Sequence, residues 1–287
     1  MTTPPPSAID EDDALTMSSP APRQGRRALP GESFLATLGD IARFGAQGFL
    51  GVPTAVRLYP TEIIRQAAKV VLSSCAVLWT FSATIGMIAA LVGSYLLASL
   101  GAQDYLGLFM AIAVIQAVSA PTFAWIYAAK VGCGYTAEIG TMRITEEIDA
   151  LNVMGVQSKV YLVSSRIAAT VLVLPFIWLA SVGTLLLGGY VVGQVLLKTS
   201  SDGGYFDLLW NFQRPIDLVL ALTWAMVTLL TLVVVSCYFG FNAEGGPVGV
   251  GRSTARSMMF NMVIVSVYTG IFYQLFWGVN IDLPIAN

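Results

Sequence analysis

Five ionisable side chains crowd into twelve residues near the middle of this sequence: Glu138, Arg143, Glu146, Glu147 and Asp149. Such groups can transfer protons or recognise charge on another molecule. The chain has no histidine, and its three cysteines form no CxxC pair, which excludes the usual zinc sites, a histidine-based triad and a histidine proton relay. We interpret the cysteines, Cys75, Cys133 and Cys237, as small packing residues. The ion-rich segment, residues 137–156, is therefore interpreted as a contact for another protein.

The same segment also fits a solvated connecting helix. Arg143 and Glu147 have (i, i+4) spacing, and their pairing would stabilise a helix by only about 0.3 kcal/mol. A helix would turn three apolar side chains toward the membrane: Ile144, Ile148 and Leu151. Glu146 and Asp149 would then point outward. These residues alone leave partner docking and a simple connector as alternatives.

The composition identifies the class of protein. Of 287 residues, 56% are hydrophobic and 11% are charged, and the mean hydropathy is +0.72. A soluble domain carries about 25% charged residues, so this chain is predicted to be an integral membrane protein. Its net charge of −2 and its lack of basic patches argue against a nucleic-acid partner.

Five runs without a charged residue follow the first quarter of the chain. They cover residues 70–103, 105–129, 167–197, 218–243 and 257–281. Because a spanning helix needs about 20 apolar residues, we predict an all-α membrane fold with spans at about 70–100, 106–129, 167–197, 218–240 and 257–279. The ion-rich segment, with a helix at about 137–155, then lies between the second and third spans.

The residues before these runs are more polar. Residues 1–31 are rich in Pro and Ser and are predicted to form a disordered cytoplasmic tail. Residues 32–60 are predicted to hold an amphipathic helix at the membrane surface and a connection. Thr61 is a candidate cap for the first spanning helix, with Glu62 in its first turn.

Basic residues predict the orientation. With the N-terminus in the cytoplasm, thirteen of the fifteen Lys and Arg residues face the cytoplasm, and only Lys198 and Arg214 fall outside. This split follows the positive-inside rule. It predicts a cytoplasmic ion-rich segment and a C-terminus on the far side of the membrane.

The predicted spans contain no Asp, Glu, Lys, Arg or His. Ion-coupled carriers usually place such groups at membrane depth, and a membrane enzyme needs an acid or a base near its substrate. Both classes are disfavoured. A transported ligand would be mostly apolar, and the free energy for moving it would come from another chain.

Two glycine patterns have alternative interpretations. Residues 246–253 nearly match GxxxxGK[ST], the phosphate-binding loop of nucleotide-binding proteins. Arg252 replaces the required lysine, and the segment joins two spans, so we reject a nucleotide site. We predict a flexible turn in which Ser253 or Thr254 caps the last helix. Glycines in the first and third spans permit close helix packing within the chain, with a dimer seam as the alternative: Gly86, Gly93, Gly189 and Gly193.

The run TAEIGTMRITEEIDALNVMGV at 136–156, preceded by VGCGY and followed by Arg166 and Pro175, resembles the signature of the MlaE/YrbE family. The glycine-rich stretch at 239–257 is similar to the actinobacterial branch. These proteins are permease subunits of ABC lipid transporters that work with MCE proteins. The resemblance covers roughly residues 33–280 and makes 61–287 the permease domain.

The resemblance implies an N-terminal interfacial helix, five spans and a cytoplasmic coupling helix that docks in a groove of the ATPase. On this basis, six residues are assigned to ATPase coupling: Glu138, Arg143, Glu146, Glu147, Asp149 and Leu151. The implied partners are an ABC ATPase dimer, a second permease copy or paralogue, an MCE-domain hexamer and a lipid. No cofactor is implied. The implied place is the bacterial plasma membrane, and the implied direction is import.

The sequence departs from the family at one point. Many members carry an Arg-Glu pair shortly before the proline of the second span, where this chain has Ala117 and Val118 before Pro121. A heterodimer of paralogous permeases would supply the pair from another chain. A scaffold that anchors an MCE complex without transporting anything is the alternative function.

Overall fold

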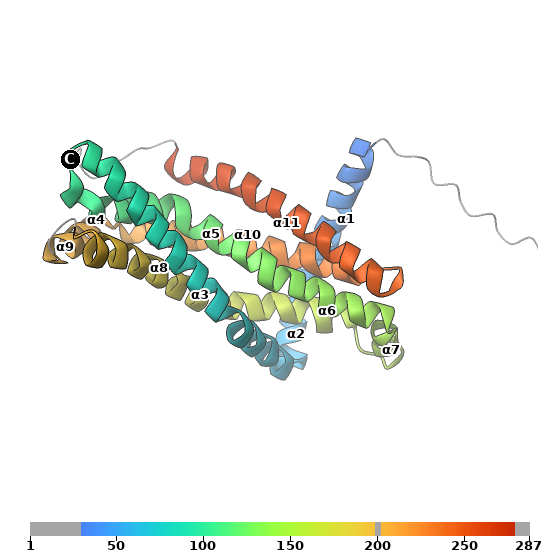
Figure 1. Cartoon of the computed structure of the whole chain (residues 1–287). Helices are drawn as coiled ribbons and strands as arrows, with labels where there is room; N and C mark the ends of the chain where they lie inside the picture. Colours follow the sequence, from blue (N-terminus) through green and yellow to red (C-terminus); the bar gives the residue numbers. More distant parts are fainter. Residues whose placement is uncertain (1–29, 199–201, 279–287) are drawn as a thin grey trace, which may run out of the picture. The chain divides into compact units, whose positions relative to one another are not determined.

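The structure, a computed structural model, describes residues 30–198 and 202–278, and every regular element in these ranges is a helix (Figure 1). Five helices are long and apolar enough to cross a membrane: Pro60–Ser99, Gln103–Ile144, Val160–Leu196, Pro215–Phe241 and Gly246–Trp277. The predicted all-helical membrane fold is confirmed. Most of the predicted tail (residues 1–29) and residues 279–281 of the last charge-free run lie outside the described ranges.

Helix α1 (Pro30–Leu50) and helix α2 (Val52–Leu58) precede the first span. The chain divides between Asp40 and Ile41 into two compact units, so α1 begins in the first unit and ends in the second. Within the second unit, the end of α1 packs on the start of the third span. The hydroxyl of Ser164 donates to the carbonyl of Gly48 at 2.8 Å, and Lys159 donates to the Gln47 side chain at 2.9 Å.

Helix α3 (Pro60–Ser99) begins one residue before the predicted cap. Its N-cap is Tyr59, and Pro60 occupies the first helical position, where a missing N–H costs nothing. The prediction that Thr61 caps this helix is therefore wrong. Glu62 does lie in the first turn, as expected.

Helix α8 (Ser165–Tyr190) packs along α3. An added Cβ at Gly86 would lie 1.8 Å from the carbonyl oxygen of Leu185, and one at Gly188 would lie 2.1 Å from that of Ala83. The two backbones meet because these positions lack side chains. Gly86 of the first span thus allows close packing within the chain, as predicted.

The second span is one long helix with changing pitch. After the short turn Gln103–Tyr105 come α4 (Leu106–Phe109), a π-helical segment (Met110–Val118) and α5 (Ser119–Tyr127), and then a second π-helical segment (Ala128–Gly132) and α6 (Cys133–Ile144). The third span similarly begins and ends in π-helical turns, Val160–Ser164 and Val191–Leu196. These wider π-helical turns were not predicted from the sequence.

Three further helices complete the chain: α9 (Asp202–Phe212), α10 (Pro215–Phe241) and α11 (Gly246–Trp277). Helix α9 was not predicted. Helix α11 begins directly after Gly245, whose φ of +86° suits glycine. Thr254 therefore lies inside the helix and donates to the carbonyl of Val250 at 2.9 Å. The predicted flexible turn capped by Ser253 or Thr254 is wrong.

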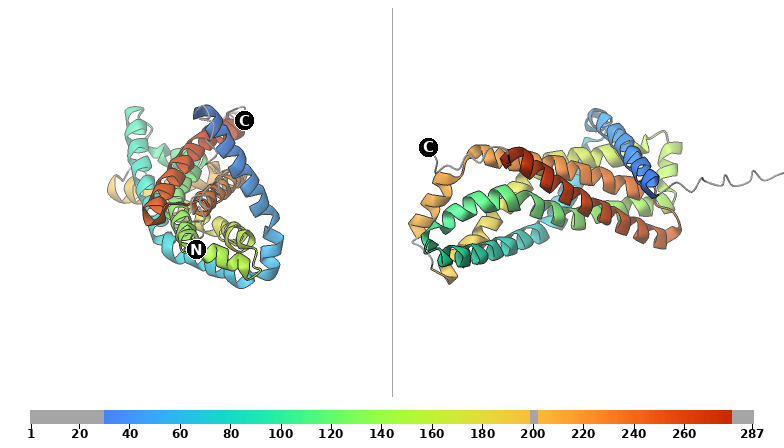
Figure 2. Two further views of the ribbon diagram at one scale, coloured as in Figure 1. Left: turned by 90° about the vertical axis from the view of Figure 1, so that its right-hand side faces the viewer. Right: turned by 90° about the horizontal axis from the view of Figure 1, so that it is seen from above.

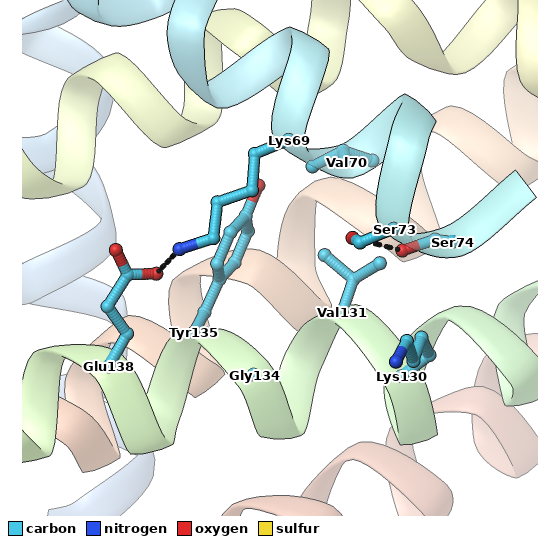
Figure 3. Close-up of a pocket in the computed structure, with 9 residues that line it drawn as sticks. All are labelled: Lys69, Val70, Ser73, Ser74, Lys130, Val131, Gly134, Tyr135 and Glu138. Atoms are coloured by element: carbon cyan, nitrogen blue, oxygen red, sulfur yellow. Dashed lines mark hydrogen bonds and ion pairs between the residues drawn. The ribbon is translucent and has the colours of Figure 1, made fainter.

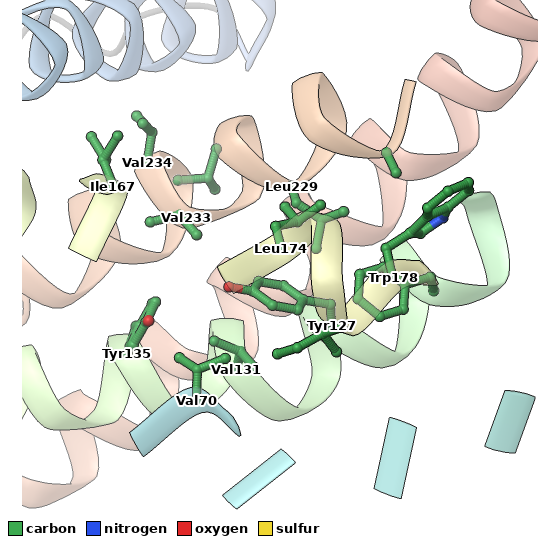
Figure 4. Close-up of a cluster of buried hydrophobic side chains, with 14 of the residues drawn as sticks. Val70, Tyr127, Val131, Tyr135, Ile167, Leu174, Trp178, Leu229, Val233 and Val234 are labelled. Atoms are coloured by element: carbon green, nitrogen blue, oxygen red, sulfur yellow. The ribbon is translucent and has the colours of Figure 1, made fainter. Parts of the chain in front are cut away.

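The core lies where the second, third and fourth spans meet (Figure 2, Figure 4). The second span contributes Tyr127 and Val131, α8 contributes Trp178, and α10 contributes Leu229 and Val233. All five side chains are buried. Cys75 and Cys237 are buried in the same cluster, as the packing interpretation predicted.

A small polar cluster joins α6, α10 and α11 inside the protein. Thr136 Oγ1 lies 3.0 Å from the Ser257 hydroxyl and 3.0 Å from the Ser236 carbonyl oxygen, and Asn261 Nδ2 donates to the Ser236 hydroxyl at 3.0 Å. All four side chains are fully buried. Because water does not reach these groups, their mutual hydrogen bonds hold the last span against the others.

We expect Asn261→Leu to lower the free energy of unfolding by about 1 kcal/mol, the scale of hydrogen bonds between membrane helices. Ser266→Ala on the same helix is the control, since Ser266 is exposed and, in the described part of the chain, bonds only the Met262 carbonyl of its own helix. That control should stay within about 0.5 kcal/mol. Denaturant titration in detergent micelles measures both, and equal losses would contradict a role for the cluster.

Candidate functional site

The ion-rich segment is divided into two parts. Residues 137–144 continue the second span as the end of α6, and helix α7 (Glu147–Val153) follows a turn. The turn is made at Glu146, whose φ of +61° lies in the left-handed region that residues with side chains seldom adopt. The prediction of one helix over 137–155 is corrected accordingly. Figure 1 shows α7 folded back beside the end of α6.

Helix α7 is anchored on its inner face. Ile148 is completely buried, and Leu151 packs against the core, as expected. Glu146, Glu147 and Asp149 are exposed. The outward position predicted for Glu146 and Asp149 is therefore correct.

Two exposed apolar residues at the end of α7 were missed by the sequence analysis. Val153 is 89% exposed, and Met154 is 69% exposed. Both lie off the apolar stripe formed by Ile144, Ile148 and Leu151. Their position outside that stripe could have predicted their exposure from the sequence. These two adjacent residues form a small exposed apolar surface beside the acidic side chains of α7.

Arg143 closes the turn between α6 and α7. Its guanidinium donates to the Asp149 carboxylate at 2.9 Å, while Glu147 accepts a hydrogen bond from Thr145 at 2.9 Å. The predicted Arg143–Glu147 pair is therefore wrong. It assumed a continuous helix, and the turn at Glu146 brings Asp149 to Arg143 instead.

Glu138 does not lie with the other acidic residues. It accepts from Lys69 of α3 at 2.7 Å and pairs with Arg166 of α8 at 3.3 Å (Figure 3 shows the Lys69 pair). Arg166 is only 1% exposed, donates to the Leu162 carbonyl at 2.8 Å and lies 5.2 Å from the centre of the Tyr135 ring. The position supports Glu138 as a link between helices rather than as a direct contact for another chain.

Two hollows lie between α3 and the second span. One is an apolar groove of about 510 Å³ whose larger side chains include Val77, Phe81 and Trp125. The other is a polar pocket of about 250 Å³ (Figure 3). Its polar lining residues are Lys69, Ser73, Ser74, Lys130, Tyr135 and Glu138. A mostly apolar groove that adjoins charged groups fits an amphipathic ligand.

Comparison with known proteins relates the chain to transport permeases. The family model described as Permease MlaE matches residues 63–275. A probable ABC transporter permease of Rickettsia prowazekii is 26% identical over 253 residues, which cover 88% of this chain and 97% of that protein. A probable ABC transporter permease of Rickettsia conorii is 27% identical over 84% of this chain and 93% of its own length. The chloroplastic protein trigalactosyldiacylglycerol 1 of Arabidopsis thaliana is 28% identical over 62% of this chain and 51% of that protein.

Proposed function

Because the chain belongs to the MlaE permease family, we propose that it is the membrane subunit of an ABC transporter that moves hydrophobic lipids between an MCE protein assembly and the plasma membrane. A separate ATPase supplies the free energy, and the proposed direction is import. The name of the Arabidopsis relative refers to a glycolipid, which supports a lipid substrate. The apolar groove between α3 and the second span supports the same class of ligand.

The observation that carries the ATPase part of the proposal is the surface of α7. This short helix is anchored by Ile148 and presents exposed Glu147, Val153 and Met154 on its outer side. Met154 belongs to a residue type that is enriched at protein interfaces, and the carboxylates around this apolar pair supply the polar rim of such a contact. We assign this surface, together with Glu146 and Asp149, to contact with the ATPase.

The remaining partners follow from the family. The working complex is proposed to contain an ATPase dimer, two permeases (two copies of this chain or one copy with a paralogue) and an MCE-domain hexamer. The plasma membrane is its proposed place, with the N-terminus in the cytoplasm. A heterodimer is favoured by Ala117 and Val118, which replace the family's Arg-Glu pair. Homogeneous dimers of this chain purified with the ATPase would count against that choice.

We expect Val153→Glu with Met154→Glu to reduce the amount of ATPase that co-purifies with the permease by about tenfold or more, since losing an interface hot spot costs about 2 kcal/mol. New charges cannot be buried in an apolar contact without a partner. Affinity purification of the tagged permease from membranes, with quantification of the ATPase, measures the effect.

Val248→Glu is the matched control. Val248 is 75% exposed near the start of α11 and is not part of α7. The amount of ATPase that co-purifies with the Val248→Glu variant should therefore match the amount recovered with the unaltered chain. Normal ATPase recovery with the α7 variant would refute the docking assignment. Normal ATPase docking together with loss of the MCE assembly and no lipid transfer would instead favour the scaffold alternative.

A further inference from the structure

The apolar groove and the polar pocket are parts of one crease, and they share Lys130. One side is a stripe on α3 with helical spacing: Val70, Ser73, Ser74, Val77, Phe81 and Ile85. The other side is a stripe on the second span with a four-residue repeat: Thr122, Ile126, Lys130, Gly134 and Glu138. At about 1.5 Å per residue, the stretch from Val70 to Ile85 is about 22 Å long.

The position of the charges fixes the polar end of the crease. Lys69 immediately precedes the first charge-free run, and Lys130 immediately follows the second. The polar pocket therefore lies where the hydrocarbon of the membrane begins, and the groove runs inward from it. With the predicted orientation, this end faces the cytoplasm.

The cationic groups at this end differ in their partners. Lys69 is paired with Glu138, which is also held by Arg166. Lys130 is exposed, and among residues 30–198 and 202–278 it has neither an ion pair nor a hydrogen bond. In Figure 3 it lies on the same helix as Gly134 and Glu138, while Ser73 and Ser74 lie on α3, across the pocket.

The two serines leave hydrogen-bonding capacity at the pocket. Their hydroxyls are 3.2 Å apart, and in the described part of the chain each has only the other as partner. Ser74 is buried, and Ser73 is exposed. A hydroxyl that bonds only another hydroxyl can still donate to an anion. Since one serine hydroxyl donates to the other, one hydroxyl proton remains available to a ligand. This donor and an ammonium group at the mouth of an apolar groove suit a carboxylate or phosphate that carries a hydrocarbon chain.

We propose that this crease binds a single anionic lipid, with its carboxylate or phosphate at Lys130 and Ser73 and its hydrocarbon chain along Val77, Phe81 and Trp125. The inference rests on the proposed function for the lipid class, and it adds the charge of the headgroup and its cytoplasm-facing position. A lipid is favoured over a free anion because the polar pocket and the groove share Lys130 and lie between the same two helices. A second permease packed on the groove would fill it without any preference for an anion.

Photo-crosslinking of the purified permease–ATPase complex tests the proposal. The probes are a palmitic acid with a diazirine on its chain and the corresponding fatty alcohol, which differs only in its headgroup. We expect the acid to label the peptides of the groove about fivefold more than the alcohol, the ratio that one charge-assisted contact gives. Lys130→Gln should reduce labelling by the acid to the level of labelling by the alcohol. Phe81→Ala should reduce labelling by both probes.

Arg252→Gln is the matched control. Arg252 is exposed on the first turns of α11, on the same side of the membrane by its charge pattern, and it does not line the crease. This variant should keep the preference for the acid. Because Lys130 is exposed and unpaired in the described residues, Lys130→Gln should elute and retain its ATPase as the unaltered chain does.

Four results would overturn the inference or its premise. Equal labelling by acid and alcohol would exclude an anion site at Lys130. Suppression of the acid's labelling to the alcohol level by inorganic phosphate would assign Lys130 to a free anion. Labelling of other helices alone would place the lipid elsewhere and leave lipid transport standing. Failure of both probes to label any part of the chain would count against lipid carriage itself and hence against the proposed function.

Discussion

Replacing Gly86 with alanine is expected to destabilise this permease by about 3 kcal/mol, the upper part of the range for overpacked sites. The added Cβ would lie 1.8 Å from the carbonyl oxygen of Leu185, where no side-chain rearrangement can relieve the clash. Helices α3 and α8 would have to separate along their shared face. Denaturant titration in detergent and the yield of folded permease in membranes both report the effect.

Gly183→Ala on α8 is the control for this prediction. An added Cβ there meets nothing within 4 Å, and alanine stabilises a helix by about 0.5 to 1 kcal/mol relative to glycine. The two substitutions therefore have opposite expected signs although their chemistry is the same. Similar losses at both positions would mean that α3 and α8 do not approach as closely as described.

The second large effect is expected at Glu138. Within residues 30–198 and 202–278, changing Glu138 to Leu leaves the buried Arg166 with the Leu162 carbonyl as its one hydrogen-bond partner. Removing the partner of a buried charge costs about 3 kcal/mol or more. Lys69→Met removes the other partner of Glu138. It should cost less than about 1 kcal/mol, because Lys69 is more than half exposed.

A double-mutant cycle isolates the buried pair. Glu138→Leu combined with Arg166→Met removes both charges, so its loss should be smaller than the sum of the two single losses by about 1 kcal/mol or more. Unfolding titrations of the four proteins provide the cycle. Additive losses would show that Glu138 and Arg166 act independently and that the link between α6 and α8 is not electrostatic.

The architecture was predictable because membrane spans obey a simple constraint. A segment inside hydrocarbon cannot hold unpaired charges, so the positions of Lys69, Asp104 and Lys130 alone bracket the first two spans. Close packing at Gly86 was also predictable, because small residues in membrane helices allow neighbouring backbones to approach closely.

The details of the ion-rich segment depend on tertiary contacts that the sequence does not encode locally. Glu146 is a good helix former, yet it adopts a left-handed conformation because burial of Ile148 fixes where α7 lies. Glu138 looks like its acidic neighbours in the sequence. Its partners, Lys69 and Arg166, are distant in the chain, and only the packing of three helices reveals them.

Some elements left weak signals in the sequence. Helix α9 occupies a stretch between the third and fourth spans that contains Gly203, Gly204 and two aspartates, a composition typical of a loop. The π-helical turns carry no sequence signature, because they differ from α-helix only by one hydrogen-bond register. The crease at Lys130 required knowing which faces of α3 and the second span meet.

The unbroken second span has a mechanical consequence. The helix Gln103–Ile144 has 42 residues, so it is about 63 Å long and works as a stiff rod whose inner end adjoins the turn to α7. Between that turn and the wall of the crease the helix has no loop, so a movement of its end at Ile144 would be transmitted along it to the crease. The helical pitch widens in the π-helical segment Ala128–Gly132, which contains Lys130. Bending there would tilt the proposed headgroup site relative to α3, so a displacement of α7 would be coupled to the geometry of that site.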